Sequence, residues 1–287
     1  MFFKMKLIDD IKRKGLRFAI RRFDSKYGLG ALERLLFRNW FNPFLTIYVC
    51  LRSFPILQAI RLPMFVYGRP RIYGLSGQMQ IEGKITMGMI RFNATYPGAP
   101  CVGSLQSEII NNGRIVYHGK CEIRTGCRIR TGENGFLELG SDTKICEMCN
   151  ICCYLNIKIG NTARIAHRSQ ILDSNYHYLA NFEKHIVPNI KRPIEIGHNC
   201  WICNSSSISG GAKIPDFTIV ASHSLVGKDF SDLNNGSLIG GIPAKLIANN
   251  IYRIWNKKMT NNIYKFFQEN SETVFHLGED TCVDDIL

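Results

Sequence analysis

The stretch IEIGHNCWICNSSSISGGAKIPDFTIVASHSLVGKD, residues 194–229, carries an aliphatic residue at every sixth position. An amphipathic helix would repeat its apolar residues every three or four positions, and a half-buried strand would alternate them every second position. A spacing of six fits neither pattern. It fits very short strands separated by tight corners, with side chains that point inward from each strand.

The same spacing occurs in two earlier blocks of the chain. The aliphatic positions are Leu139, Ile145, Ile151 and Ile157; then Ile159, Ile165 and Ile171; then Ile196, Ile202, Ile208, Ile214, Val220 and Val226. Two residues before most of these positions stands a small residue, such as Cys149 or Ala163, whereas Leu155 is large. Residues two apart on a strand point to the same side, so we expect both sets to face a common core.

Three units of six residues make a coil of 18, and stacked coils make a parallel β-helix. This register predicts that Ile196 stacks on Ile214 and that Ile202 stacks on Val220, at about 4.8 Å per coil. Glycine, asparagine and aspartate residues fall at the expected corners, where a positive φ or a capping side chain is needed.

The chain has 287 residues, of which 45% are hydrophobic, and this is enough to bury a large core. Asp9 and Asp10 stand where a secretory signal would carry its apolar segment, so we expect the protein in the cytoplasm. The uncharged run 39–51 has 13 residues and ends at Arg52. A membrane-spanning helix needs about 20 apolar residues, so no span is expected.

Most of the net charge of +13 belongs to the N-terminal part of the chain. Residues 1–71 hold 15 Lys and Arg against 4 Asp and Glu, whereas the other 216 residues carry only +2. No nucleic-acid-binding motif accompanies these charges, so no nucleic-acid partner is predicted. The mixture of basic and apolar residues in 1–60 predicts either peripheral contact with an anionic membrane or a solvated helical face on the main domain.

Three regions are expected along the chain. A basic arm spans 1–64, with helices at 8–23 and 29–41, and the β-helix spans 65–248, with its strict repeat at 139–248 and an excursion at 93–106. A C-terminal helix and acidic tail occupy 249–287. The expected apolar stripe of that helix consists of Ile251, Trp255, Met259 and Ile263.

Several of the eleven cysteines have the CxxC spacing that is typical of zinc or redox sites. In the six-residue register, Cys149 and Cys200 point inward, whereas Cys146, Cys152 and Cys203 point outward. The two members of each pair therefore diverge, and no metal or redox site is predicted.

From 139 to 248 the chain resembles the hexapeptide-repeat acyltransferases, through IEIGHNCWIC, TIVASHSLVGKDF and LIGGIPAKLI. The resemblance implies an all-β, left-handed parallel β-helix, acetyl-CoA as the acyl donor, no metal, and a homotrimer with its sites between neighbouring coils. The left hand comes from the resemblance, because general chirality rules favour right-handed crossovers. Within the family the chain is most similar to sugar O-acetyltransferases, including those that act on surface polysaccharides, and to xenobiotic acetyltransferases.

The family places a catalytic histidine beside an excursion from the coil, and ILDSNYHYLANFEKHIVPNIKRPIEIG, residues 171–197, contains one. The step from Ile171 to Ile196 is 25 residues where an uninterrupted coil takes 18, so a loop must project there. We expect His177 to be the general base, with His185 in reserve. The side chain that fixes the His177 tautomer is predicted to be one of three: Asp173, Asn175 or Glu183.

The resemblance also implies a donor site. Its residues are Trp201, Asn204, Ser222, Gly227, Lys228 and Lys245, with the two lysines suited to phosphate groups. Ser222 and His223 stand where relatives often have Ala and Gly, so these larger side chains are expected to narrow the path of the pantetheine group.

The expected function is acyl-CoA-dependent O-acetylation of a sugar hydroxyl in the biosynthesis of capsule, exopolysaccharide or lipopolysaccharide, by direct transfer without an acyl-enzyme. The alternatives are N-acetylation of an amino sugar, acetylation of a xenobiotic, or a non-catalytic β-helix scaffold. The zinc carbonic anhydrases that share this scaffold need three converging histidines, and no such pattern is evident in the sequence.

Overall fold

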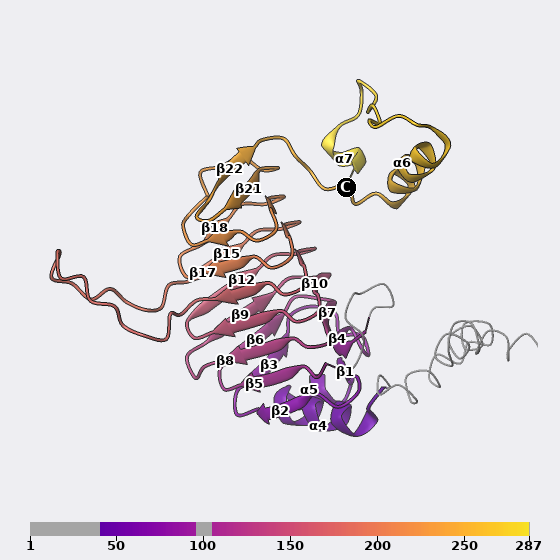
Figure 1. The fold of residues 1–287 in the computed structure, drawn as a ribbon. Coiled ribbons are helices and arrows are strands. Elements are labelled where there is room, and N and C mark those ends of the chain that lie inside the picture. Colours follow the sequence, from indigo (N-terminus) through magenta and orange to yellow (C-terminus); the bar gives the residue numbers. More distant parts are fainter. Residues whose placement is uncertain (1–40, 96–104, 287) are drawn as a thin grey trace, which may run out of the picture.

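The computed structural model describes residues 41–95 and 105–286. Its strands form three long sheets around one axis, and each coil from β1 to β18 contributes one strand to each sheet (Figure 1). The first sheet contains β1 (Met64–Val66), β4 (Ile90–Ala94), β7 (Cys121–Arg124), β10 (Thr143–Ile145), β13 (Arg164–Ile165), β16 (Trp201–Ile202), β19 (Ile219–Val220), β21 (Leu238–Gly241) and β22 (Ala244–Ala248).

The other two sheets are built in the same way. The second contains β2 (Arg71–Gly74), β5 (Glu108–Asn111), β8 (Arg128–Thr131), β11 (Asn150–Cys153), β14 (Gln170–Leu172), β17 (Ser207–Ser209) and β20 (Leu225–Val226). The third contains β3 (Gln78–Ile81), β6 (Arg114–Tyr117), β9 (Phe136–Leu139), β12 (Asn156–Ile159), β15 (Ile194–Ile196) and β18 (Lys213–Ile214).

The strand register confirms the repeat that the sequence predicts. Ile196 pairs with Ile214 in the third sheet, and Ile202 pairs with Val220 in the first sheet. Ile208 lies on β17 in the second sheet, so the three successive aliphatic positions occupy three successive walls. The chain forms the left-handed parallel β-helix that the resemblance implies.

The core is a set of aliphatic ladders inside the coil. The ladder of the first sheet consists of Phe92, Ile123, Ile145, Ile165, Ile202, Val220 and Ile239, each 0–1% exposed. The small residues beside the ladders, such as Cys149 and Ala163, are also buried. Each fully buried aliphatic side chain contributes about 1.5–3 kcal/mol, so the stack as a whole, rather than any one contact, holds the coil together.

The β-helix begins well before the strict repeat. Ile109 pairs with Ile129 and Ile129 with Ile151, at separations of 20 and 22 residues that exceed the ideal 18. Buried polar residues also stand inside these early coils, where the Thr131 hydroxyl donates a hydrogen bond to the Asn111 side chain. Because the corners are longer and some interior positions are polar, the sequence of these early coils does not show the six-residue period.

Two short helices, α4 (Pro43–Ser53) and α5 (Ile56–Ala59), cover the N-terminal end of the coil (Figure 1). The Asn42 side chain accepts a hydrogen bond from the Leu45 backbone N–H at 3.0 Å, and Pro43 occupies the first turn. The sequence analysis predicted no helix here. The predicted helices at 8–23 and 29–41 lie outside the described residues, except for Phe41.

The last coil is covered by the antiparallel hairpin of β21 and β22. The expected C-terminal helix is present as α6 (Lys257–Glu269), while Ile251 and Trp255 precede it in an extended segment. The Trp255 backbone N–H donates to the Ile286 carbonyl at 2.7 Å, which ties the short α7 (Val283–Ile286) to this segment. No helix within 41–95 and 105–286 is long and apolar enough to cross a membrane.

Candidate functional site

The expected excursion after Ile171 is a long loop at the corner between β14 and β15. Residues 173–193, here called the projecting loop, extend far from the coil (Figure 1). Two isolated antiparallel bridges, Ser174 with Lys191 and Asn181 with Ile186, give the loop a hairpin-like path. Every residue from 175 to 189 is exposed.

Asp173 fastens the base of the projecting loop to the coil below it. Its carboxylate is fully buried and accepts hydrogen bonds from the backbone N–H groups of Tyr154, Leu155 and Asn156 at 2.8, 2.8 and 2.9 Å. These bonds occupy the carboxylate. The structure thus gives Asp173 a positioning role at the loop base in place of the predicted role of orienting the His177 ring.

His177 lies on the outgoing arm of the projecting loop. Its backbone N–H donates to the Asn175 carbonyl at 2.8 Å, and its side chain is exposed. Tyr176 precedes it with φ of 62°, and the Tyr176 ring packs edge-on against Tyr154 with centroids 5.2 Å apart. Within the described part of the chain, no hydrogen bond or ion pair engages the His177 imidazole, so its ring nitrogens are open to a ligand or another subunit.

The other residues predicted beside His177 are also exposed. In the described residues, Asn175, Glu183 and His185 form no hydrogen bond or ion pair with the His177 ring. The projecting loop further exposes large apolar side chains: Tyr178 at 71%, Leu179 at 67%, Phe182 at 83%, Ile186 at 51% and Val187 at 58%. An apolar surface of this kind is typical of an interaction site.

Four of the six predicted donor-binding residues flank the second sheet near the end of the coil. Asn204 and Ser222 occupy the same corner in consecutive coils, and the Ser222 hydroxyl donates to the Asn204 side chain at 2.8 Å. Gly227 and Lys228 follow β20 at the next corner. A Cβ atom on Gly227 would lie 2.6 Å from the Ser209 hydroxyl, which would have to turn away.

The other two predicted residues, Trp201 and Lys245, lie on the first sheet. Trp201 faces outward as predicted, but the C-terminal segment of the same chain covers it. The Arg253 guanidinium lies 4.7 Å from the Trp201 ring centroid and 4.3 Å from that of Trp255, whose other neighbour, Arg164, is 4.8 Å away. Within one chain, the six residues are therefore divided between two sheets.

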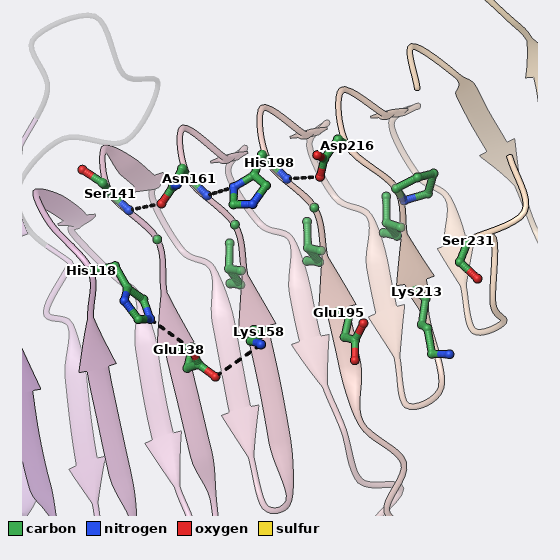
Figure 2. A pocket seen from close by; sticks show the side chains of 17 residues that line it. His118, Glu138, Ser141, Lys158, Asn161, Glu195, His198, Lys213, Asp216 and Ser231 are labelled. Carbon is green, nitrogen blue, oxygen red and sulfur yellow. Dashed lines mark hydrogen bonds and ion pairs between the residues drawn. The ribbon is translucent and has the colours of Figure 1, made fainter. Parts of the chain in front are cut away.

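The sequence analysis missed a groove of about 580 Å³ on the outer face of the third sheet (Figure 2). Charged residues of alternating sign, Glu138, Lys158, Glu195 and Lys213, stand in register across β9, β12, β15 and β18. Each of these four charged residues lies between two inward-facing residues. The alternation along the strands could therefore have identified this row of outward-facing charges from the sequence. The Lys213 ammonium lies 2.8 Å from Asp229 and lowers the pKa of that carboxyl to about 2.

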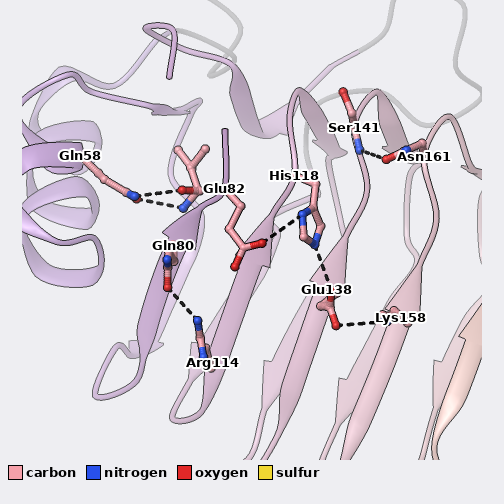
Figure 3. A network of polar contacts seen from close by, with 10 residues as sticks. Gln58, Gln80, Glu82, Arg114, His118, Glu138, Ser141, Lys158 and Asn161 are labelled. Atoms are coloured by element: carbon pink, nitrogen blue, oxygen red, sulfur yellow. Dashed lines mark hydrogen bonds and ion pairs between the residues drawn. The ribbon is translucent and has the colours of Figure 1, made fainter. Parts of the chain in front are cut away.

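One wall of the groove is a ladder of corner residues (Figure 2). The Asn161 side chain accepts from the Ser141 N–H at 2.8 Å, His198 Nδ1 accepts from the Asn161 N–H at 2.9 Å, and Asp216 accepts from the His198 N–H at 2.7 Å. His198 thus joins successive coils. Further along the same face, His118 lies between Glu82 and Glu138, with ring nitrogens 3.5 and 3.0 Å from their carboxylates (Figure 3).

The cysteines diverge as predicted in two of the CxxC pairs. Cys149 and Cys200 are buried, with thiols near the carbonyls of Ala166 and Pro215, whereas Cys146 and Cys203 are partly exposed. Cys152 shares the outer face with Asn150, to which its thiol bonds at 3.3 Å, yet it is buried. In the described residues, no group of three or more His, Cys, Asp or Glu could hold a metal ion.

A comparison with protein-family models gives no match. A protein from Klebsiella pneumoniae, described as an uncharacterized 24.8 kDa protein in cps region, is 33% identical over 147 residues. The match covers 50% of this chain and 62% of the relative, so the chain spans less than two thirds of that protein.

Solved structures give more distant likenesses. The polySia-specific acetyltransferase NeuO is 18% identical, with 72% of this chain and 84% of that chain covered and a TM-score of 0.40. AntD, an N-acyltransferase from Bacillus cereus solved with dTDP and 3-hydroxybutyryl-CoA, is 13% identical, with 72% and 87% covered and a TM-score of 0.41.

Since these likenesses are distant, the assignment of the fold rests on the aliphatic repeat and on the strand pairing of the chain itself. By these two features, the chain is a parallel β-helix built on a six-residue repeat.

Proposed function

We propose that this protein is an acyltransferase, and specifically that it transfers an acetyl group from acetyl-CoA to a sugar hydroxyl of a surface polysaccharide or its precursor. The observation that carries the proposal is the exposed imidazole of His177, which has no partner among the described residues, on a loop whose base Asp173 anchors to the coil. The position of this histidine in the repeat also matches the resemblance found in the sequence.

The reaction needs a base for one proton and no metal. The sugar oxygen attacks the thioester carbonyl carbon while His177 removes the hydroxyl proton. The C–S bond then breaks, and the imidazolium returns the proton to the departing thiolate. The products are an O-acetyl ester and the free thiol of CoA, and no acetyl group is attached to the protein.

The residues beside the second sheet fit the donor. Lys228 is exposed, so its ammonium can bind a phosphate group, and Gly227 beside it adds no side chain of its own. Asn204 and Ser222 offer polar groups at the preceding corner of the same sheet. Donor binding at Trp201 and Lys245 stays a prediction, and Arg253 has to leave the Trp201 ring before a ligand can stack there.

A homotrimer would cover the apolar side chains of the projecting loop and would place groups of a neighbouring copy next to His177. The projecting loop exposes six large apolar side chains and a histidine whose ring has no hydrogen-bond or ion-pair partner among the described residues. A neighbouring copy that covers Phe182 and its neighbours would also place its own groups next to His177. We therefore propose that each site forms between two copies, and that the enzyme works in the cytoplasm, where acetyl-CoA is available.

The acceptor is proposed from chemistry and from one relative. The description of the Klebsiella pneumoniae relative mentions a cps region, which supports a search among surface polysaccharides and their precursors. The test is acceptor profiling with radiolabelled acetyl-CoA, followed by mild alkali, which removes O-acetyl esters but leaves N-acetyl amides. Alkali-labile label on a sugar supports the proposal. Alkali-stable label alone, or no transfer to any sugar, contradicts it.

A further inference from the structure

The helix α4 has a buried face and, opposite to it, an exposed apolar face. Its buried residues are Thr46, Val49, Cys50 and Ser53, which face the end of the coil. On the other side, Phe44, Ile47, Tyr48 and Leu51 follow the spacing i, i+3, i+4, i+7 and are 81%, 47%, 52% and 53% exposed. The core explains the first stripe, but it does not explain the second.

The following helix extends the exposed stripe. In α5 and at its C-cap, Ile56, Leu57 and Ile60 are 63%, 75% and 63% exposed. These three residues and the four of α4 are called the α4–α5 apolar face. Gln58 fixes its position, because the Gln58 side chain donates to the Ile81 carbonyl and accepts from the Ile81 N–H, both at 2.9 Å (Figure 3).

The charge around the face identifies what covers it. Residues 41–71 contain four arginines, all exposed, and no Asp or Glu. The segment that precedes Phe41, residues 1–40, holds 11 Lys and Arg against 4 Asp and Glu. That segment, or a second copy of the same face, would bring like charge to Arg52 and Arg61. An anionic lipid surface instead complements both the arginines and the preceding segment.

We propose that the α4–α5 apolar face binds the surface of an anionic lipid membrane. Aliphatic side chains enter the boundary between headgroups and acyl chains, the rings of Phe44 and Tyr48 lie at headgroup level, and the arginines contact lipid phosphates. The helices lie along the surface, since neither is long enough to span it. The inference does not depend on the acyltransferase proposal.

Co-sedimentation of the full chain with vesicles tests this proposal. One vesicle preparation contains phosphatidylglycerol and phosphatidylcholine, and the other contains phosphatidylcholine alone. The test variant is Leu57→Asp with Ile60→Asp, and the matched control is Val274→Asp with Leu277→Asp, at side chains that are 54% and 51% exposed in the C-terminal region. We expect the test variant to lose about tenfold or more in partition onto the anionic vesicles, while the control binds like the wild type.

High salt separates insertion from simple charge attraction. At about 1 M salt the Debye length falls to about 3 Å, so contacts made only by basic residues disappear. Insertion predicts residual binding for the wild type and the control, but none for the test variant. The proposal is overturned if the wild type ignores anionic vesicles, if the test variant binds like the wild type, or if high salt abolishes the binding of all three proteins. Circular dichroism confirms that each variant is folded.

Discussion

The buried carboxylate of Asp173 lies 2.8 Å from the backbone nitrogen of Leu155, so the first residue of the projecting loop is bonded to a corner of the preceding coil. Two more backbone N–H groups, of Tyr154 and Asn156, share the same carboxylate. Since the loop carries His177, the position of the proposed base depends on a bond network that contains no catalytic group.

Replacement of Asp173 by Asn should weaken the fold. The amide has one acceptor oxygen where the carboxylate has two, and its NH₂ group faces a backbone donor. We expect a loss of about 2–3 kcal/mol in the free energy of unfolding, measured by urea denaturation. The control is Asp232→Asn, at an exposed position. Equal stability of the two variants would show that the three hydrogen bonds are not important.

The C-terminal segment should loosen when its arginine is removed. Arg253 lies between the rings of Trp201 and Trp255, and cation–π contacts of this kind contribute about 0.5–2 kcal/mol. Arg253→Ala should therefore speed proteolysis within residues 249–256, followed by mass spectrometry of the fragments, whereas exposed Lys258→Ala should not. Identical cleavage rates would mean that the ring contacts do not hold the segment.

Cysteine labelling should follow burial. Burial raises the pKa of Cys146 to about 11 and that of Cys200 to about 12, so both remain protonated thiols near neutral pH. In the described residues, we expect iodoacetamide at pH 8 to modify exposed Cys282 first, and labelling of Cys146 to rise only as the pH approaches 11. Peptide mapping measures both rates. Rapid labelling of Cys146 at pH 8 would point to a reactive thiol, which the structure does not predict.

The oligomeric state should depend on the projecting loop. Light scattering after size exclusion is expected to give the mass of three chains for the wild type. Phe182→Ser should shift the protein toward smaller species, because that side chain is 83% exposed in a single chain and needs a neighbour to cover it. The control is Phe44→Ser, at a side chain 81% exposed at the other end of the coil. A monomeric wild type would remove the proposed shared site.

The later coils could be predicted from sequence because one aliphatic residue every six positions leaves few alternatives. Ile196, Ile202 and Ile208 each lie on the predicted wall. The strict repeat could not be recognised in the early coils because corners of variable length break the six-residue period, as between Ile109, Ile129 and Ile151.

Other features could not be predicted for physical reasons. Helix α4 was not predicted, although proline suits the first turn of a helix and Asn42 provides the N-cap. The role of Asp173 depends on stacking, because its partners come from a coil 17–19 residues earlier in the chain. Arg253 reaches Trp201 from outside the repeat, where no periodicity gives its position.

The central claim is that His177 acts as the general base, and a paired mutation in the projecting loop tests it most directly. With radiolabelled acetyl-CoA and the best sugar acceptor, we expect His177→Ala to lower the rate of acetyl transfer by about a hundredfold or more. His185→Ala, at an exposed histidine of the same loop, should transfer at nearly the wild-type rate. Wild-type transfer by the His177→Ala protein, or a loss confined to the His185→Ala protein, would contradict this assignment.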